Sequence, residues 1–158
     1  MNANLLVLSP LDSSFQADSF SSGEQVIDRQ LRDYLAFPPN PELIDVTVAA
    51  YPADDEVQGY MALRLALRLN YGQLPKALGI PFDQKMEPAL EVAFLGVTQA
   101  WRGKGLGRRL LGTAWALGKE AGFRILTLSA LNDRLIQYYT SLGFVRVGYS
   151  MRMIARIQ

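Results

Sequence analysis

The chain has 158 residues, of which 49% are hydrophobic, so we expect one domain with a sizeable core over residues 1–158. It contains no cysteine and no histidine, which excludes disulfides, cysteine nucleophiles, Ser-His-Asp triads and the usual zinc ligands. The net charge of +1 divides into −7 over residues 1–98 and +8 over residues 99–158. A basic half suits an anionic cofactor and an acidic half a cationic acceptor, although charge runs are also typical of solvated faces.

No apolar stretch reaches the length of a membrane span. The first residues, Met1–Leu5, lack the basic region of a signal peptide, and Asp12 soon interrupts the apolar residues. We therefore expect a cytoplasmic protein that does not contact a membrane.

The first half of the chain alternates between patterns of strand and helix. Asn4–Leu8 is predicted to be a short strand, and apolar residues recur at helical spacing over Val26–Phe37, after the capping residues of Ser21–Glu24. The β-branched and apolar segments Leu43–Tyr51 and Val57–Leu69 predict a hairpin. The segment that follows, 70–88, is rich in glycine and proline and is predicted to be a long loop.

The second half continues the alternation. Its predicted elements are a strand over Leu90–Val97, a helix over Leu106–Ala121, a strand over Arg124–Ser129, a helix over Asp133–Leu142 and a closing strand segment over Phe144–Ile157. Strands that alternate with helices in this order indicate an α/β fold with a mixed sheet flanked by helices.

A glycine-rich turn, Arg102–Gly107, lies between the predicted strand and the long helix. Glycines at alternate positions leave no Cβ atoms between a ligand and the backbone, so several N–H groups can converge on it. The helix that follows adds its unpaired N–H groups and its positive dipole end, and Lys104, Arg108 and Arg109 add charge. This arrangement suits a phosphate or pyrophosphate, although the spacing alone also fits an ordinary tight turn before a basic helix.

The order Arg102-x-x-Gly105-x-Gly107 resembles the acetyl-coenzyme A signature of the GNAT N-acetyltransferase superfamily. A second landmark resembles the same family: Asn132, followed seven residues later by Tyr139 in a Tyr-x-x-x-Gly-Phe ending. One departure is Gln99, which stands where the family commonly has proline. The resemblance is specific from about Leu90 to Phe144 and only architectural before that.

The resemblance implies a GNAT fold, in which a mixed central β-sheet splays near its fourth strand and acetyl-CoA lies in the opening. Leu90–Val97 would be that strand, with its backbone paired to the pantetheine arm. A strand glycine such as Gly96 would allow close approach, but it can also mark a bulge. The implied cofactor-binding residues are Leu95, Gly96, Val97, Arg102, Gly103, Lys104, Gly105, Leu106, Gly107, Arg108 and Asn132.

Acetyl transfer to an amine requires the amine to lose its proton, because an ammonium has no lone pair to attack a thioester. Glu91 is the candidate base, since it lies in an otherwise apolar strand. The run Glu91–Val97 also resembles the histone-acetylating branch of the family, in which a glutamate six residues before the equivalent valine is the base. The alternatives are a strand-end glutamate that reaches water and deprotonation through bound water.

Tyr139 is the candidate acid, because a phenol can donate a proton or a hydrogen bond to the departing thiolate. The alternative is an aromatic core residue, which is a common role for tyrosine in such a helix. Since the chain has no cysteine, we expect direct attack in a ternary complex rather than a cysteinyl intermediate.

The acceptor is predicted to be a primary amine of a small molecule or peptide. A faint resemblance of Phe20–Gly23, Ile27, Asp28 and Leu31 to the toxin-like branch leaves aminoacyl-tRNA as an alternative. The acidic N-terminal half disfavours RNA, whereas Arg146, Arg152 and Arg156 leave room for it. A non-catalytic acetyl-CoA sensor is a further alternative. Val145–Ile157 is long and apolar enough for a homodimer, but a closing strand within one monomer would have the same pattern.

Overall fold

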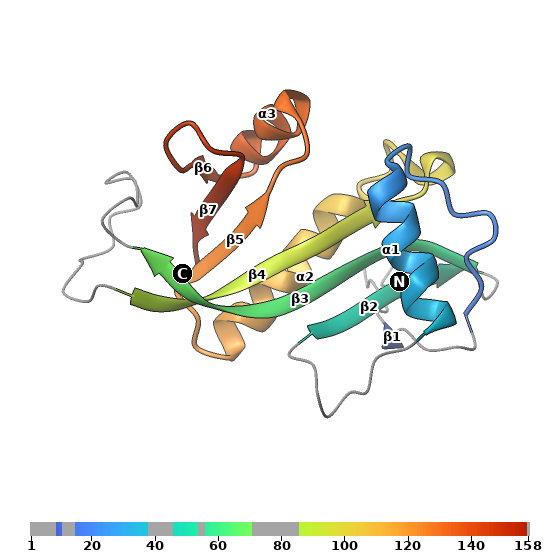
Figure 1. The fold of residues 1–158 in the computed structure, drawn as a ribbon, viewed down its shortest axis with the longest axis horizontal. Coiled ribbons are helices and arrows are strands. Elements are labelled where there is room, and N and C mark those ends of the chain that lie inside the picture. The colour runs from blue at the N-terminus through green and yellow to red at the C-terminus, as the bar shows by residue number, and fades with distance from the viewer. Residues whose placement is uncertain (1–8, 11–14, 38–45, 54–55, 71–85, 158) are drawn as a thin grey trace, which may run out of the picture. The chain divides into compact units, whose positions relative to one another are not determined.

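The computed structural model describes residues 9–10, 15–37, 46–53, 56–70 and 86–157 (Figure 1). The elements in chain order are β1 (Ser9–Pro10), α1 (Gln25–Ala36), β2 (Val46–Ala53), β3 (Glu56–Asn70), β4 (Met86–Val97), the short 3-10 helix η3 (Gln99–Trp101), α2 (Leu106–Glu120), β5 (Ile125–Ser129), α3 (Asp133–Ser141), β6 (Val145–Arg146) and β7 (Arg152–Arg156). The predicted strand Asn4–Leu8 and most of the predicted loop lie outside the described residues. None of the described helices is long and apolar enough to cross a membrane.

The predicted α/β fold with a mixed sheet and flanking helices is confirmed. The C-terminal segment Phe144–Ile157, which was predicted to close the sheet, forms two antiparallel strands, β6 and β7. The turn between them closes when Val147 N–H donates to Arg152 O at 2.9 Å and Ser150 N–H donates to Val147 O at 3.1 Å. Gly148, with φ +56°, supplies the left-handed residue of that turn.

The chain divides into two compact units. The first comprises Met1–Leu63 and Phe94–Thr113, and the second comprises Arg64–Ala93 and Ala114–Gln158. Strands β3 and β4 and helix α2 therefore contribute residues to both units.

In the first unit, α1 packs through one face. Ile27 and Leu31, four residues apart, are its buried side chains. The ring of Tyr60 on β3 meets that of Phe20 edge-on at 5.8 Å, and its hydroxyl donates to Ile27 O at 2.7 Å. The side chain of Leu106, in the first turn of α2, packs against Gly59 of β3, where an added Cβ would lie 2.9 Å from it.

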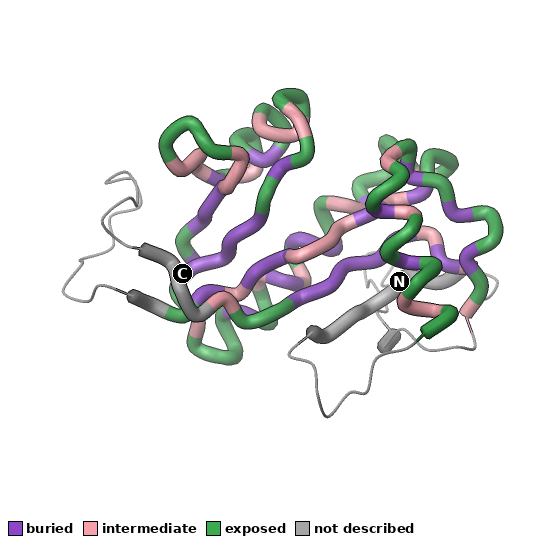
Figure 2. Tube along the Cα trace, viewed as in Figure 1, coloured by how far each residue is buried: buried purple, intermediate pink, exposed green. Residues whose placement is uncertain are grey.

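In the second unit, the strand order is β3-β4-β5-β7-β6. Strand β5 is parallel to β4 and antiparallel to β7, so the sheet is mixed. Residues Ile125–Leu128 of β5 are all buried, as expected of a strand covered on both faces (Figure 2). The pairing of β4 with β5 runs from Leu90 to Val92, and β4 itself continues to Val97.

Candidate functional site

The glycine-rich turn depends on two backbone conformations that favour glycine. Gly103 has φ +76° and Gly105 has φ +78°, in the left-handed region that residues with a Cβ rarely adopt. An added Cβ at either position would meet no atom within 4 Å among the described residues. Glycine is therefore required here by conformation and not by crowding, and no described residue fills the space beside the turn.

The side chains around the turn have different roles. Lys104 and Arg108 are exposed, and Lys104 Nζ lies 5.0 Å from the centre of the Trp101 ring. The guanidinium of Arg102 instead donates through Nη2 to the carbonyl oxygen of Ser22, which ties the turn to the segment before α1. Leu106 is buried, so its main-chain N–H, at the first position of α2, is the group that it can offer to a ligand.

The last residues of β4 show why a glycine occurs there. An added Cβ at Gly96 would lie 2.5 Å from Ile27 Cγ2 and 3.0 Å from the Tyr60 ring. The atoms that lie close to Gly96 therefore belong to core side chains beneath α1. Because side chains alternate along a strand, Leu95 and Val97 belong to the opposite face, and both are half-buried.

The second landmark of the sequence is the end of a helix. After α3, Phe144 N–H donates to Tyr139 O and Gly143 N–H donates to Thr140 O, both at 3.1 Å, and Gly143 has φ +100°. These are the two hydrogen bonds of a Schellman motif, which also brings the side chains at its two ends into contact. The rings of Tyr139 and Phe144 meet at 5.8 Å. The Tyr-x-x-x-Gly-Phe spacing therefore follows from how α3 ends.

Tyr139 is buried, with 7% of its surface exposed. Burial, and to a smaller extent the neighbouring Tyr138, raises the pKa of the Tyr139 hydroxyl to about 12. The phenol therefore keeps its proton at neutral pH. At the other end of α3, Asn132 is the N-cap, and its side-chain oxygen accepts from Leu135 N–H at 3.0 Å.

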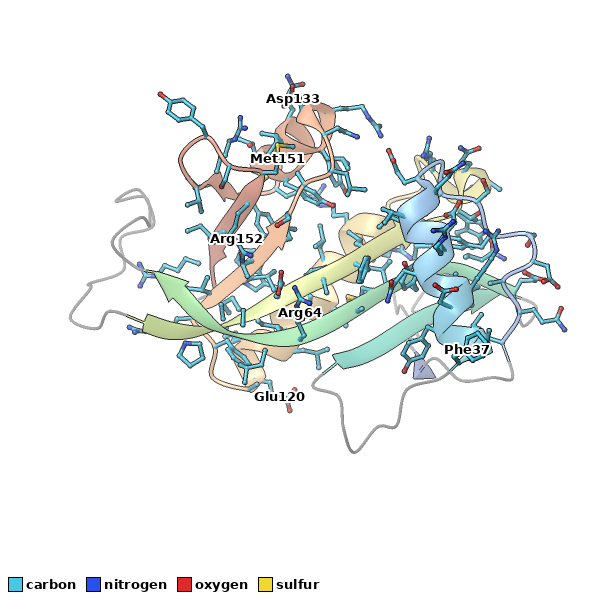
Figure 3. All side chains as sticks on the ribbon, viewed as in Figure 1. Phe37, Arg64, Glu120, Asp133, Met151 and Arg152 are labelled. Carbon is cyan, nitrogen blue, oxygen red and sulfur yellow. The ribbon has the colours of Figure 1, made fainter. Side chains whose placement is uncertain are left out.

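Glu91 lies in a charge cluster formed by Arg64 on β3, Glu91 on β4 and Arg152 on β7. Arg64 Nε donates to Glu91 Oε2 at 2.5 Å, and Arg152 Nη2 lies 4.0 Å from Glu91 Oε1. Figure 3 labels the two arginines. Arg152 Nη1 also donates to Thr127 Oγ1 at 3.4 Å. Glu91 is buried, with 7% of its surface exposed, and its Oε2 is already engaged by Arg64.

The predicted site residues fall into two groups. Leu95–Val97 and Arg102–Arg108 lie in the first unit, whereas Glu91, Asn132 and Tyr139 lie in the second. Sequence reasoning missed Arg64 as a partner of Glu91. The apolar strand segment Val57–Leu69 contains two charged residues, Arg64 and Arg68, and no local pattern indicates which of them pairs with Glu91. Within the described ranges, no three His, Cys, Asp or Glu side chains cluster as metal ligands would.

Comparison with known proteins identifies the family. The model of the acetyltransferase (GNAT) family matches residues 12–144. Similar solved structures include AtaT complexed with acetyl-methionyl-tRNAfMet, with 21% identity, a TM-score of 0.77 and coverage of 95% of this chain and 94% of that one. A bacterial toxin has 19% identity, a TM-score of 0.79 and coverage of 98% and 93%. AtaTR bound with acetyl-CoA has 18% identity, a TM-score of 0.69 and coverage of 96% and 92%.

A search of curated protein sequences found no match. The family model alone spans well over half of the sequence, and the structural likeness independently gives the same fold. The chain therefore belongs to the GNAT acetyltransferase family.

Proposed function

We propose that the protein is an N-acetyltransferase that moves an acetyl group from acetyl-CoA to a primary amine. The observation that carries the proposal is the glycine-rich turn of a GNAT-family chain, with Gly103 and Gly105 in left-handed conformations, no described residue filling the space beside them and α2 directly after them. One structural neighbour, AtaTR, was solved with acetyl-CoA bound.

The turn would hold the pyrophosphate of acetyl-CoA through main-chain N–H groups of residues 103–107. The positive end of the α2 dipole would strengthen the binding of an anion by those groups, and the exposed side chains of Lys104 and Arg108 add positive charge. Arg102 stabilises the turn through its hydrogen bond to Ser22 O. On β4, we propose main-chain contacts to the pantetheine arm from Leu95 and Val97, which lie beyond the segment Leu90–Val92 that pairs with β5.

Tyr139 is the proposed acid. When bound, acetyl-CoA supplies a thioester whose leaving group is a thiolate, and a phenol that is protonated at neutral pH can donate to it. The raised pKa of Tyr139 and its fixed ring beside Phe144 suit that role. Because the side-chain oxygen of Asn132 is engaged in capping α3, we propose that Asn132 acts by positioning that helix.

The base is Glu91 or a bound water. In the structure, Arg64 Nε donates to Oε2 of Glu91, so an incoming amine would have to compete with a guanidinium for that oxygen. A water that relays the proton avoids this competition. Either route permits direct attack by the amine, and the absence of cysteine from the sequence rules out a cysteinyl intermediate.

The acceptor that we propose first is the amine of a small molecule or peptide. Aminoacyl-tRNA is the second candidate, and a specific observation favours it: AtaT, solved with acetyl-methionyl-tRNAfMet, matches 95% of this chain. The charge of +8 on residues 99–158 suits the phosphates of acetyl-CoA and would also suit those of tRNA. A non-catalytic acetyl-CoA sensor is the alternative outside enzymes.

Thiol release from acetyl-CoA tests the proposal. The purified protein is mixed with small amines, polyamines, amino acids, basic peptides and charged tRNA in separate reactions, with Tyr139→Phe as the control enzyme. Release that depends on one acceptor class supports acetyl transfer and identifies the acceptor. If no acceptor causes thiol release but acetyl-CoA still raises the melting temperature, the result would favour the sensor. If acetyl-CoA neither releases thiol nor raises the melting temperature, the cofactor assignment would be overturned.

A further inference from the structure

The charge cluster of Arg64, Glu91 and Arg152 has two positive charges and one negative charge. Its carboxylate is buried, with a side-chain exposure of 9%, whereas the side chains of Arg64 and Arg152 are 50% and 36% exposed. The negative charge of the cluster is therefore buried, whereas part of each arginine side chain is accessible to solvent. Two like charges gathered around one buried carboxylate leave an excess positive charge that an anion would balance.

The hydrogen-bond donors of the cluster are only partly used. A guanidinium has five N–H donors in a rigid fork that matches carboxylate and phosphate oxygens. Glu91 takes the Nε–H of Arg64, and within the described part of the chain the other N–H groups of Arg64 donate to no residue. On Arg152, Nη1 donates to Thr127 and Nη2 faces Glu91 at 4.0 Å.

We propose that Arg64 and Arg152 form a binding site for an oxyanion, a carboxylate or a phosphate, carried by the acceptor. Glu91 is then a positioning residue, because its Oε2 accepts a hydrogen bond from Arg64 and its Oε1 forms an ion pair with Arg152 at 4.0 Å. An oxyanion bound between the arginines completes the charge balance through charge-assisted hydrogen bonds. The proposal rests on the proposed acetyl transfer, and it predicts that the preferred amine has an anionic group nearby.

A purely structural cluster is the competing explanation. Arg64, Glu91 and Arg152 come from three strands of the second unit, so the cluster could serve only to join β3, β4 and β7. A structural role predicts that variants lose stability but that the protein has no anion affinity at this position. Anion affinity therefore separates the two explanations.

Calorimetric titration with inorganic phosphate, at constant ionic strength in chloride, measures this affinity. Saturating acetyl-CoA occupies the glycine-rich turn, and a Gly105→Asp background gives a second way to remove that site. We expect Arg64→Met and Arg152→Met each to weaken phosphate binding about tenfold, the loss expected for one charge-assisted hydrogen bond. Arg134→Met, on the exposed face of α3, is the matched control and should change nothing. Equal phosphate binding by the wild type and the double variant would overturn the proposal.

Glu91→Met tests the positioning role. Removing a negative charge would by itself strengthen anion binding, so weaker phosphate binding in this variant indicates that Glu91 holds the arginines in place. Tighter binding would contradict that role. Repeating the titrations with acetate distinguishes a site for carboxylates from a site for phosphates.

Kinetics connects the anion site to the acceptor. For the acceptor class found by thiol release, Arg64→Met should raise KM about tenfold for the anionic compound and leave KM unchanged for its uncharged amide or ester analogue. Equal effects on both compounds would overturn the link to the acceptor. Failure of the proposed acetyl transfer is distinguishable, because it would abolish acetyl-CoA binding or turnover while phosphate binding to the arginines remained.

Discussion

The glycine-rich turn and the charge cluster are built in opposite ways. The turn is contiguous in sequence and exposed, and main-chain conformations at Gly103 and Gly105 define it. The cluster joins side chains from three strands around the buried carboxylate of Glu91. A site made of backbone is damaged by a single added Cβ, whereas a site made of paired charges is damaged by changing one charge. Variants of the two regions should therefore fail differently, the first in ligand affinity and the second in stability and anion binding.

The largest effect is expected from Gly105→Asp in the turn. The substitution places a Cβ at φ +78°, which destabilises the left-handed backbone conformation of the turn by about 1–2 kcal/mol. It also puts a negative charge where phosphate is expected. Loss of the charge-assisted hydrogen bonds adds about 1.5–3 kcal/mol, so we expect acetyl-CoA affinity to fall about a thousandfold. Calorimetric titration with acetyl-CoA measures it.

Two variants serve as controls for the turn. Gly112 lies within α2 and is exposed, and no described residue lies within 4 Å of an added Cβ, so Gly112→Ala should stabilise the helix by about 0.5–1 kcal/mol without weakening acetyl-CoA binding. Gly105→Ala has the backbone strain without the charge and should be intermediate. Unchanged affinity in a folded Gly105→Asp protein would contradict the pyrophosphate assignment.

Tyr139→Phe tests the second unit's contribution to chemistry. Loss of a general acid typically lowers the rate about a hundredfold or more, so we expect kcat to fall by about that factor while the Kd for acetyl-CoA stays the same. Tyr138→Phe is the matched control, because Tyr138 neighbours the same ring but is exposed. Equal loss in both variants, or loss of acetyl-CoA binding, would argue that Tyr139 is a packing residue.

Local signals allowed the turn and the end of α3 to be predicted from the sequence. The glycines of the turn and the Tyr-x-x-x-Gly-Phe run each fix a backbone conformation within a few residues. The helices were predicted to within a few residues at their ends for the same reason, since 3.6-residue periodicity and terminating residues are local. Phe144–Ile157 was predicted only to close the sheet, and its division into β6 and β7 depends on the turn at Gly148.

The charge cluster could not be predicted, because strand topology creates it. Arg64 and Arg152 are distant in sequence from Glu91 and meet it only once β3, β4 and β7 lie in one sheet. The same limit applies to Arg102 and Gly96. Their residue types suggested contact with a ligand, but Arg102 bonds Ser22 O and Gly96 makes room for Ile27. A sequence pattern indicates that something approaches closely, and the fold decides what it is.

Glu91→Gln should lower stability by a smaller amount than removal of a fully buried ion pair. Breaking such a pair costs about 3–5 kcal/mol, but half of the Arg64 side chain is exposed, so we expect about 1–2 kcal/mol of the free energy of unfolding. Urea denaturation measures it, with the exposed Asp133→Asn as the control. The rate distinguishes the roles of Glu91: a base predicts a large loss of kcat with a changed pH profile, whereas the positioning role predicts a change mainly in the KM of the acceptor.

The smallest effect concerns the alkaline stability of the wild type and Tyr139→Phe. Burial raises the pKa of Tyr139 from 10.0 to about 12, so the folded state keeps a proton that the unfolded state loses between these values. The free energy of unfolding should therefore fall as the pH rises from 10 to 12, by at most about 1.4 kcal/mol per pH unit for this group, and be unaffected below pH 10. Other tyrosines, including the buried Tyr60, are present in both proteins and cancel in the difference. The denaturation midpoint of the wild type should thus fall relative to that of Tyr139→Phe between pH 9 and pH 11. An unchanged difference between the two midpoints would show that burial does not hold the proton of Tyr139.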